Sequence, residues 1–393
     1  MRYTDYKKEE ILLKTHVLSG LDSIQMVDKD LRGRRIGLMT NPTGINHALR
    51  SNIDILHNAY GLSALFGCEH GVRGDLQAGA KVDTYKDEET GVTVFSVYGK
   101  TERLTPEMID AFDVLVFDMQ DVGSRFYTYL YSLAYAMEAC AEAGKKIIVL
   151  DRLNPIGGIK QGGTVLDLAF RSFVGDYEIP TKTGITIGEY ARYIAHYLKL
   201  DLDLTVVPLQ GWSRKLYLDD TDTPWVAPSP NCMTLTSALV FSGTCIFEGS
   251  NLSEGRGTTQ PFELIGAPYI NGAALAKEMA LLNLPGVFFR QTSFVPTFSK
   301  HQGALCHGVQ LHILDREEMD ICHAGLKLMD TIRRMYPDDF TFLTSDEGKT
   351  FFLDKLLGTD TYRLGEHNAD TLLKAHEAKV AQFAQAVQPF KLY

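Results

Sequence analysis

The chain has 393 residues, of which 45% are hydrophobic and 22% are charged, and its formal net charge is -10. This length predicts two domains, and the acidic balance argues against binding to nucleic acid or to an anionic membrane surface. No apolar run is long enough to cross a bilayer, and the first residues lack the apolar core of a signal peptide. We therefore expect a cytoplasmic or periplasmic protein without membrane insertion.

The first half of the chain alternates short apolar runs with helical segments. Uniformly apolar strands separated by helices are typical of a parallel sheet covered on both faces. The sequence Thr186-Ile187-Gly188-Glu189 matches a capping box, which favours Glu189 as a helix cap over a catalytic acid. The predicted strands are 35–40, 62–66, 92–97, 113–118, 146–151 and 204–208, and the predicted helices are 51–60, 126–143 and 187–200. We predict a Rossmann-like α/β domain over residues 1–235.

The second half has fewer alternating units. Residues 221–231 are rich in proline and polar side chains, and we place the domain boundary just after them. A strand at 310–314 and helices at 319–336 and 368–386 fit a smaller α+β domain over residues 236–393. The six cysteines form no Cys-x-x-Cys pair, and no His-Glu-x-x-His segment occurs, so we predict buried thiols and no metal site.

The loop after the predicted strand 62–66 is the most informative segment of the chain. It places Glu69, His70 and Arg73 between glycines at the carboxyl end of a strand. Ligands bind at that edge of open α/β sheets, and glycine lets the backbone approach a ligand closely. The alternative is a charged surface turn in which Arg73 pairs with Asp75.

Other strand ends add polar side chains to the same predicted edge. A further polar segment between glycines, 247–259, comes from the second domain. Together these groups predict a crevice suited to a polyhydroxylated ligand, with a solvated loop as the alternative interpretation of 247–259. The residues concerned are Asn41, Asp118, Gln120, Asp121, Arg125, Asp151, Arg152 and Asn154 in the first domain and Glu248, Ser253, Glu254 and Arg256 in the second.

Carboxyl groups at such a crevice can cleave a glycosidic bond in pairs, one protonating the leaving oxygen and one acting as base or nucleophile. Glu69 is our candidate acid, and His70 is a candidate for orienting it. For Asp118 and Asp151, which end strands, helix capping or a buried ion pair is the favoured alternative. The candidates for the second carboxyl group are Asp118, Asp121, Asp151, Glu248 and Glu254.

Arginines and tyrosines near these carboxyl groups are candidates for substrate binding. A guanidinium binds a carboxylate through two parallel hydrogen bonds, although it can equally neutralise a neighbouring acid. Tyr127, Tyr131 and Tyr135 recur every four residues, so we expect them to share one helix face, in the core or as a stacking platform. The arginines concerned are Arg73, Arg125, Arg152 and Arg256.

Several of these segments resemble the NamZ-like exo-β-N-acetylmuramidases, bacterial glycoside hydrolases formerly described as a domain of unknown function. The resemblance runs from about residue 20 to the C-terminus. The segments that carry it are Thr40-Asn41-Pro42-Thr43-Gly44, Glu69-His70-Gly71-Val72-Arg73-Gly74, Phe117-Asp118-Met119-Gln120-Asp121-Val122-Gly123-Ser124-Arg125-Phe126-Tyr127, Leu150-Asp151-Arg152-Leu153-Asn154-Pro155, Pro228-Ser229-Pro230-Asn231 and Ser253-Glu254-Gly255-Arg256-Gly257-Thr258.

The resemblance implies release of N-acetylmuramic acid from the non-reducing end of peptidoglycan fragments, in a cleft between two domains and without a cofactor. It implies that Glu69 is the catalytic glutamate and adds Asn231 to the substrate-binding candidates. One departure is Lys182-Thr183-Gly184, where relatives tend to carry Arg-His-Gly. Two alternatives are a non-catalytic muropeptide-binding protein and a nucleotide-dependent α/β enzyme. The chain lacks the phosphate-binding glycine signatures that the latter requires.

Overall fold

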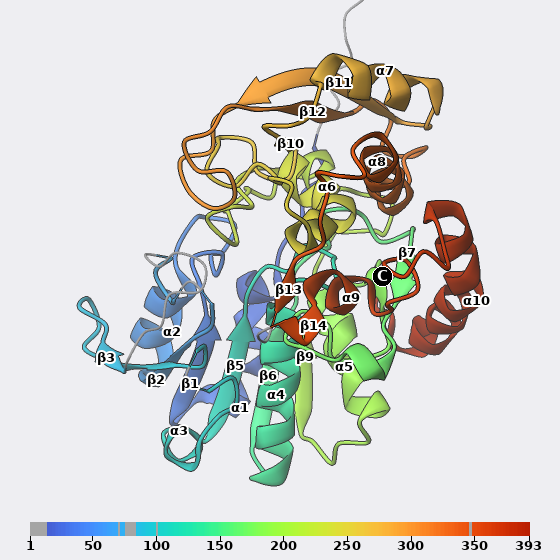
Figure 1. The fold of residues 1–393 in the computed structure, drawn as a ribbon. Helices are drawn as coiled ribbons and strands as arrows, with labels where there is room; N and C mark the ends of the chain where they lie inside the picture. The colour runs from blue at the N-terminus through green and yellow to red at the C-terminus, as the bar shows by residue number, and fades with distance from the viewer. Residues whose placement is uncertain (1–13, 70, 75–83, 100, 346–347) are drawn as a thin grey trace, which may run out of the picture.

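The computed structural model describes residues 14–393 except 70, 75–83, 100 and 346–347 (Figure 1). The first domain is built on a seven-stranded sheet with the order β3-β4-β2-β1-β5-β6-β9, in which only the β3–β4 pair is antiparallel. The strands are β1 (Ile36–Thr40), β2 (Leu62–Gly67), β3 (Tyr85–Lys86), β4 (Thr93–Ser96), β5 (Val114–Asp118), β6 (Lys146–Leu150) and β9 (Leu204–Val207). The predicted Rossmann-like α/β fold is confirmed.

Helices cover both faces of this sheet, as its uniformly apolar strands require. Leu38 and Val116 pack with the helices on one face, and their neighbours Met39 and Phe117 pack with those on the other. The first face is covered by η1 (Gly20–Val27), α1 (Asp28–Leu31) and α2 (Asn52–Tyr60), and the second by α3 (Pro106–Asp110), α4 (Tyr129–Glu142) and α5 (Ile187–Tyr197). The strand order turns back between β1 and β5, so a crevice is expected at their carboxyl ends.

The second domain has a three-stranded antiparallel sheet with the order β10-β12-β11. In Figure 1 this sheet and α7 lie at the top, with α6 and α8 between them and the first domain. The elements are α6 (Leu235–Thr244), η4 (Cys245–Gly249), β10 (Leu264–Ala267), α7 (Gly272–Leu281), β11 (Val287–Phe294), β12 (Cys306–Ile313), α8 (Ile321–Met335), β13 (Thr344–Ser345), β14 (Thr350–Phe351), α9 (Phe352–Leu357), α10 (Ala369–Val387) and η6 (Gln388–Phe390). The boundary predicted after residue 235 falls one residue into α6 and stays a proposal.

The C-terminal part of the chain returns to the first domain. Helix α10 packs beside β7 (Gly162–Val165), which pairs with β8 (Pro180–Lys182) (Figure 1). The Tyr393 hydroxyl donates to Asp151 at 2.8 Å and accepts from the Leu209 N–H at 2.6 Å. One hydrophobic core therefore includes side chains from both domains.

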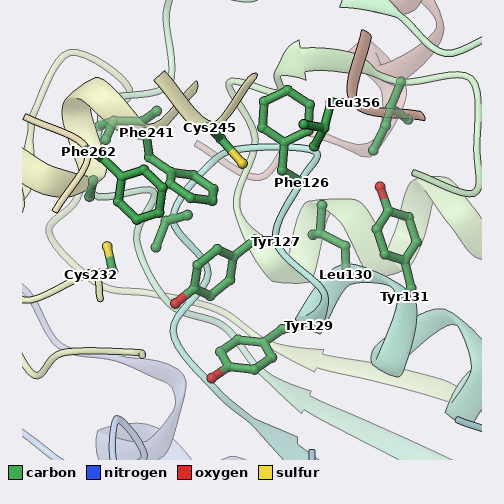
Figure 2. Packing of buried hydrophobic residues seen from close by; sticks show 14 of the residues in the cluster. Phe126, Tyr127, Tyr129, Leu130, Tyr131, Cys232, Phe241, Cys245, Phe262 and Leu356 are labelled. Atoms are coloured by element: carbon green, nitrogen blue, oxygen red, sulfur yellow. The ribbon is translucent and has the colours of Figure 1, made fainter. Parts of the chain in front are cut away.

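The tyrosines near α4 differ from the prediction. Helix α4 begins at Tyr129, so Tyr127 precedes it, and the predicted shared face is wrong for this residue. Figure 2 shows the Tyr127 and Tyr131 rings pointing in different directions. Tyr131 and Tyr135 both pack on Phe173, with ring centroids 6.4 and 6.3 Å apart. The four-residue spacing of the tyrosines extends beyond the start of the helix, because residues 123–128 form a turn and not a helix.

Other sequence expectations can be compared directly with the fold. The capping box at α5 is present, with the Thr186 hydroxyl accepting from the Glu189 N–H at 3.2 Å. All six cysteines are buried and free of disulfides, as predicted. No helix in the described part of the chain combines the length and apolar character needed to span a membrane. The elements that were not predicted are the strands β3, β7, β8, β10, β11, β13 and β14 and the helices α1, α3, α6, α7 and α9.

Helices α6 and α8 cross so closely that a glycine is required at the contact. A methyl group at Gly325 would collide with the carbonyl oxygen of Gly243. We expect Gly325→Ala to lower the free energy of unfolding by about 1–3 kcal/mol, because the two helices must separate. Urea denaturation measures this, and Gly162→Ala is the control, since a methyl group there has no atom within 4 Å. Equal effects of the two substitutions would contradict this account of the crossing.

Candidate active site

A cavity of about 1040 Å³ lies between the two domains. Loops that follow β2, β4 and β5 form one wall, and η4 with the loop around residue 256 forms the other. Aromatic side chains make up much of its surface, and Figure 2 shows Tyr127, Phe241 and Phe262 grouped together there. The lining includes Glu69, Tyr98, Glu102, Phe126, Tyr127, Thr128, Tyr129, Phe173, Asn231, Phe241, Cys245, Glu248, Arg256, Phe262, Phe298, Phe352 and Leu356.

Glu69 stands two residues beyond β2, and two hydroxyl groups hold its carboxyl group. The Tyr98 hydroxyl donates to Oε1 at 3.1 Å, and the Thr128 hydroxyl donates to Oε2 at 3.0 Å. A hydroxyl group can donate or accept, so both neighbours can serve the ionised and the protonated carboxyl group. This arrangement suits a residue that gives up and regains a proton. His70 lies outside the described residues.

Thr128 occupies the N-cap position of α4, but its side chain caps no backbone N–H there. N-cap threonines usually accept a hydrogen bond from the first turn, which stabilises the helix by about 1 kcal/mol. Here the hydroxyl donates to Glu69 instead. This hydrogen bond links the start of α4 to the glutamate.

A second carboxyl group on the same wall, Glu102, was missed in the sequence. Partial desolvation raises the pKa of Glu102 above its usual value, although the residue as a whole is exposed. Burial, together with the Glu69 charge, also raises the pKa of Tyr98, so this phenol stays protonated and remains a donor. Both residues follow β4, the strand beside β2, so the rule that pointed to Glu69 would have found them at this strand end as well.

The opposite wall carries a cluster of paired charges. Arg256 Nη2 lies 2.6 Å from Glu248 Oε1, and Arg256 Nε lies 3.2 Å from Glu254 Oε1. Lys300 contacts the other oxygen of Glu254 at 2.8 Å. Arg256 is the only cation among the described residues that line the cavity. Its Nη1 makes no hydrogen bond within the described part of the chain, so it can donate to a bound anion.

The structure thus brings five of the predicted site residues to one cavity, namely Glu69, Tyr127, Asn231, Glu248 and Arg256. Two others lie directly behind its wall. Glu254 is buried in the charge cluster, and the Ser253 hydroxyl accepts from the Gly255 N–H at 3.2 Å. These two residues shape the loop that presents Arg256.

Polar side chains at the ends of β1, β5 and β6 bind one another instead of facing the cavity. Asp118 is fully buried and accepts from Arg152 at 2.6 and 2.9 Å. Asp151 accepts from the Gly188 N–H in the first turn of α5 at 2.7 Å. These are the ion pair and the helix cap that strand-end position favoured, and neither aspartate lines the cavity.

Neighbouring amides complete this network. The side-chain oxygen of Asn41 accepts from the Thr43 hydroxyl at 2.6 Å, and the side-chain amide of Asn154 donates to the Ile185 backbone carbonyl at 3.0 Å. The Gln120 amide donates to the Leu153 carbonyl at 2.8 Å. Gln120 and Arg152 line a separate, smaller hollow. Substrate binding by the residues of this network stays a prediction that the geometry does not support.

The two other predicted arginines also lie away from the cavity. Arg125 is fully buried and donates to the carbonyl oxygens of Thr164 at 2.7 Å and Leu356 at 2.5 Å. Arg73 pairs with Asp87 at 2.9 Å and Glu89 at 3.0 Å. Asp75, its expected partner, lies outside the described residues. The guanidinium groups that surround the cavity are therefore fewer than the sequence suggested.

Lys182 and Thr183, where the sequence differs from the pattern of its relatives, belong to the structure that supports the site. Both side chains are buried, and neither lines the cavity. The Thr183 N–H donates to the Gly123 carbonyl at 3.0 Å, in the turn that leads to Arg125. A substitution at either position therefore affects the turn before α4.

Fold and site together define a two-domain α/β protein with a carboxyl-bearing cavity between its domains. Two family models match the chain, the N-terminal domain of exo-β-N-acetylmuramidase NamZ over residues 36–236 and its C-terminal domain over residues 239–393. The chain therefore belongs to the NamZ exo-β-N-acetylmuramidase family, as its motifs predicted. It is 48% identical over 392 residues to the peptidoglycan β-N-acetylmuramidase NamZ of Bacillus subtilis, covering 98% of this chain and 94% of that protein.

Two solved structures of DUF1343 family proteins from Bacteroides fragilis share the fold. One is 35% identical with a TM-score of 0.88, covering 97% of this chain and 100% of the other. The second is 29% identical with a TM-score of 0.74, covering 96% of this chain and 99% of the other. The likeness extends over both domains.

Burial of Asp121, in the loop after β5, makes stability depend on pH. Burial raises the pKa of this carboxyl group from 3.8 to about 7. Between these two values the folded protein holds a proton that the unfolded chain releases, so this group's contribution to stability is lost as pH rises toward 7. Asp121→Asn keeps the neutral form, and we expect its unfolding free energy to decline less steeply with pH, by up to about 1.4 kcal/mol per unit.

Urea denaturation between about pH 5 and pH 7 measures this difference. The Asn side chain can still accept from the Gly123 N–H, which donates to Asp121 Oδ2 at 2.7 Å. Asp201→Asn, at an exposed position, is the control and should leave the slope unchanged. Parallel pH profiles for wild type and Asp121→Asn would show that the carboxyl group is not protonated in the folded state.

Proposed function

We propose that this protein is an exo-acting glycoside hydrolase that releases N-acetylmuramic acid from the non-reducing end of peptidoglycan fragments. One observation carries the proposal: Glu69 lines the cavity between the two domains and is held there by two hydroxyl groups. The named relative in Bacillus subtilis, a peptidoglycan β-N-acetylmuramidase, supports the substrate class. Small glycan fragments in the cytoplasm or the periplasm are the proposed substrates.

In this mechanism Glu69 acts as general acid. Its proton passes to the glycosidic oxygen as the bond to the anomeric carbon breaks, and the resulting carboxylate can later take a proton from the attacking water. Tyr98 and Thr128 keep the carboxyl group oriented through both steps by rotating their hydroxyl hydrogens. Glu102 and Glu248 also reach the cavity and are the proposed candidates for the second carboxyl group.

The charge cluster accounts for selection of the sugar. N-Acetylmuramic acid differs from N-acetylglucosamine by a lactyl ether that ends in a carboxylate. Arg256 lines the cavity and keeps N–H donors beyond those used by Glu248 and Glu254, and a guanidinium binds a carboxylate with two parallel hydrogen bonds. The aromatic wall offers apolar surface to the faces of the sugar ring.

Replacement of the proposed acid tests the mechanism. Glu69→Gln keeps the shape but cannot transfer the proton, so we expect turnover to fall about 10²–10⁴-fold. The assay measures free N-acetylmuramic acid released from its disaccharide with N-acetylglucosamine at the reducing end. Glu107→Gln, on the exposed side of α3, is the matched control and should retain activity. Near-native turnover by Glu69→Gln would remove Glu69 from the mechanism.

The same assay distinguishes the non-catalytic alternative. If the wild-type protein binds the disaccharide saturably but yields no product after long incubation, the chain is a muropeptide-binding protein. We expect product.

Arg256→Lys tests recognition of the lactyl carboxylate. Lysine keeps the positive charge between Glu248 and Glu254 but loses the planar fork. We expect kcat/KM on a synthetic muramic acid glycoside to fall about tenfold or more, since a hydrogen bond to a charged group contributes about 1.5–3 kcal/mol. The slower reaction on the matching N-acetylglucosamine glycoside should be unchanged.

Arg73→Lys is the control for this experiment, because Arg73 pairs with Asp87 away from the cavity. It should leave both substrates unaffected. Equal losses on the two glycosides with Arg256→Lys would assign Arg256 a purely structural role.

A further inference from the structure

Two histidines and an aspartate meet at the surface of the first domain, outside the cavity. They are His16, His47 and Asp222, and one ligand atom from each lies within 4.8 Å of the others. We propose that these three side chains bind a divalent transition metal ion of the zinc type. Imidazole with carboxylate is a ligand set that suits zinc, copper and nickel better than magnesium or calcium.

The ligand atoms already converge on one point. His16 Nδ1 lies 2.6 Å from Asp222 Oδ2, and His47 Nε2 lies 3.7 Å from the same oxygen. The two imidazole rings are 4.7 Å apart at an angle of 81°, so they face the carboxylate from different directions. In tetrahedral zinc sites with bonds of about 2.1 Å, neighbouring ligand atoms lie about 3.4 Å apart. Small side-chain shifts therefore suffice.

The surrounding backbone orients the ligands. The Val17 N–H donates to Asp222 Oδ1 at 3.0 Å, which turns the other oxygen toward the histidines. The backbone N–H of His47 donates to Asp22 Oδ1 at 2.7 Å, and this bond holds the loop that carries the imidazole ring. Outer contacts of this kind fix the orientation of metal ligands. His16 is 62% exposed, so an ion can enter and keep a water molecule as a fourth ligand.

Binding of an ion here would join three segments that are distant in the sequence. Thr15 and Thr221 form a backbone bridge, as do Leu18 and Gln210, so the segment around His16 runs along the segment that carries Asp222. His47 lies on the loop between β1 and α2 and also lines the smaller hollow with Gln120 and Arg152. An ion bound to all three side chains therefore holds these three segments together at this edge of the sheet.

No local sequence motif indicates this site, which is why we predicted no metal site from the sequence. His16 and Asp222 are separated by 206 positions, and the familiar spacings of zinc ligands cover only a few tens of residues. Only folding places them together.

Zinc titration of the full-length, untagged protein after chelator treatment tests the proposal. We expect one ion per chain by calorimetry, a higher Tm, and a visible absorption band with Co²⁺ as the probe. His47→Ala and Asp222→Asn should each weaken zinc binding by more than about 100-fold, because even an outer contact of a metal ligand is worth 10–100-fold.

His323→Ala is the matched control. His323 pairs with Asp370 at 2.7 Å, but the next partner of that aspartate is Lys327 at 2.9 Å instead of a second imidazole. This variant should bind zinc as the wild type does. Circular dichroism verifies that each variant folds.

Either of two results would overturn the proposal: absence of saturable zinc binding to the wild type, or equal affinity in wild type, His47→Ala and Asp222→Asn. Since the readouts are binding, spectrum and Tm, the result is independent of whether the protein hydrolyses glycans.

Discussion

A single buried guanidinium, that of Arg125, joins the two domains beside the cavity. Arg125 is fully buried and pairs with no carboxylate in the part of the chain that the structure describes, and burial lowers its pKa to about 10. An unpaired buried charge is costly, so its N–H groups must find carbonyl oxygens. They find those of Thr164 and Ile179 in the first domain and Leu356 in the second. Phe126, which follows Arg125, and Leu356 both line the cavity, so this contact connects two segments of its lining.

The polar side chains at the carboxyl edge of the sheet serve two different purposes. Asp118, Asp151 and Arg152 bind each other, helix N–H groups and loops, and so hold the strand ends in place. Glu69 stands farther along its loop and reaches the cavity. The buried network gives a rigid base, and rigidity around a catalytic carboxyl group preserves its orientation. In this protein most of the charged residues near the site support it, and only a few face the proposed substrate.

Much of the first domain could be predicted, because short apolar runs, period-3.6 patterns and caps are local signals. The six parallel strands and the helices α2, α4 and α5 were found to within a few residues. Glu69 was also found, since a polar loop between glycines follows a buried strand. Glu102 was missed although β4 carried the same signal. The start of α4 was misplaced because tyrosine spacing does not reveal where a turn becomes a helix.

The second domain was harder, because its antiparallel sheet lacks the alternation of strands and helices that marks the first domain. Its helix α6 is buried along most of its length, which leaves no clear polar face to give a periodic pattern. The sequence also did not show which charged side chains are exposed to solvent and which are buried. Arg125 and Arg256 look alike in the sequence, each beside polar residues and glycines, yet one is buried among carbonyl oxygens and the other faces the cavity. The same limit applies to His16, His47 and Asp222, which share no segment of the chain.

The amino-acid sequence by itself determined the parallel sheet, the family, and the presence of a carboxyl group beyond the second strand, because each depends on residues close together in the chain. Only the tertiary structure decided which polar groups face the cavity, which ones neutralise each other, and which distant side chains converge. Those outcomes depend on distances through space and on the loss of water around each charge, and neither follows from the order of residues along the chain.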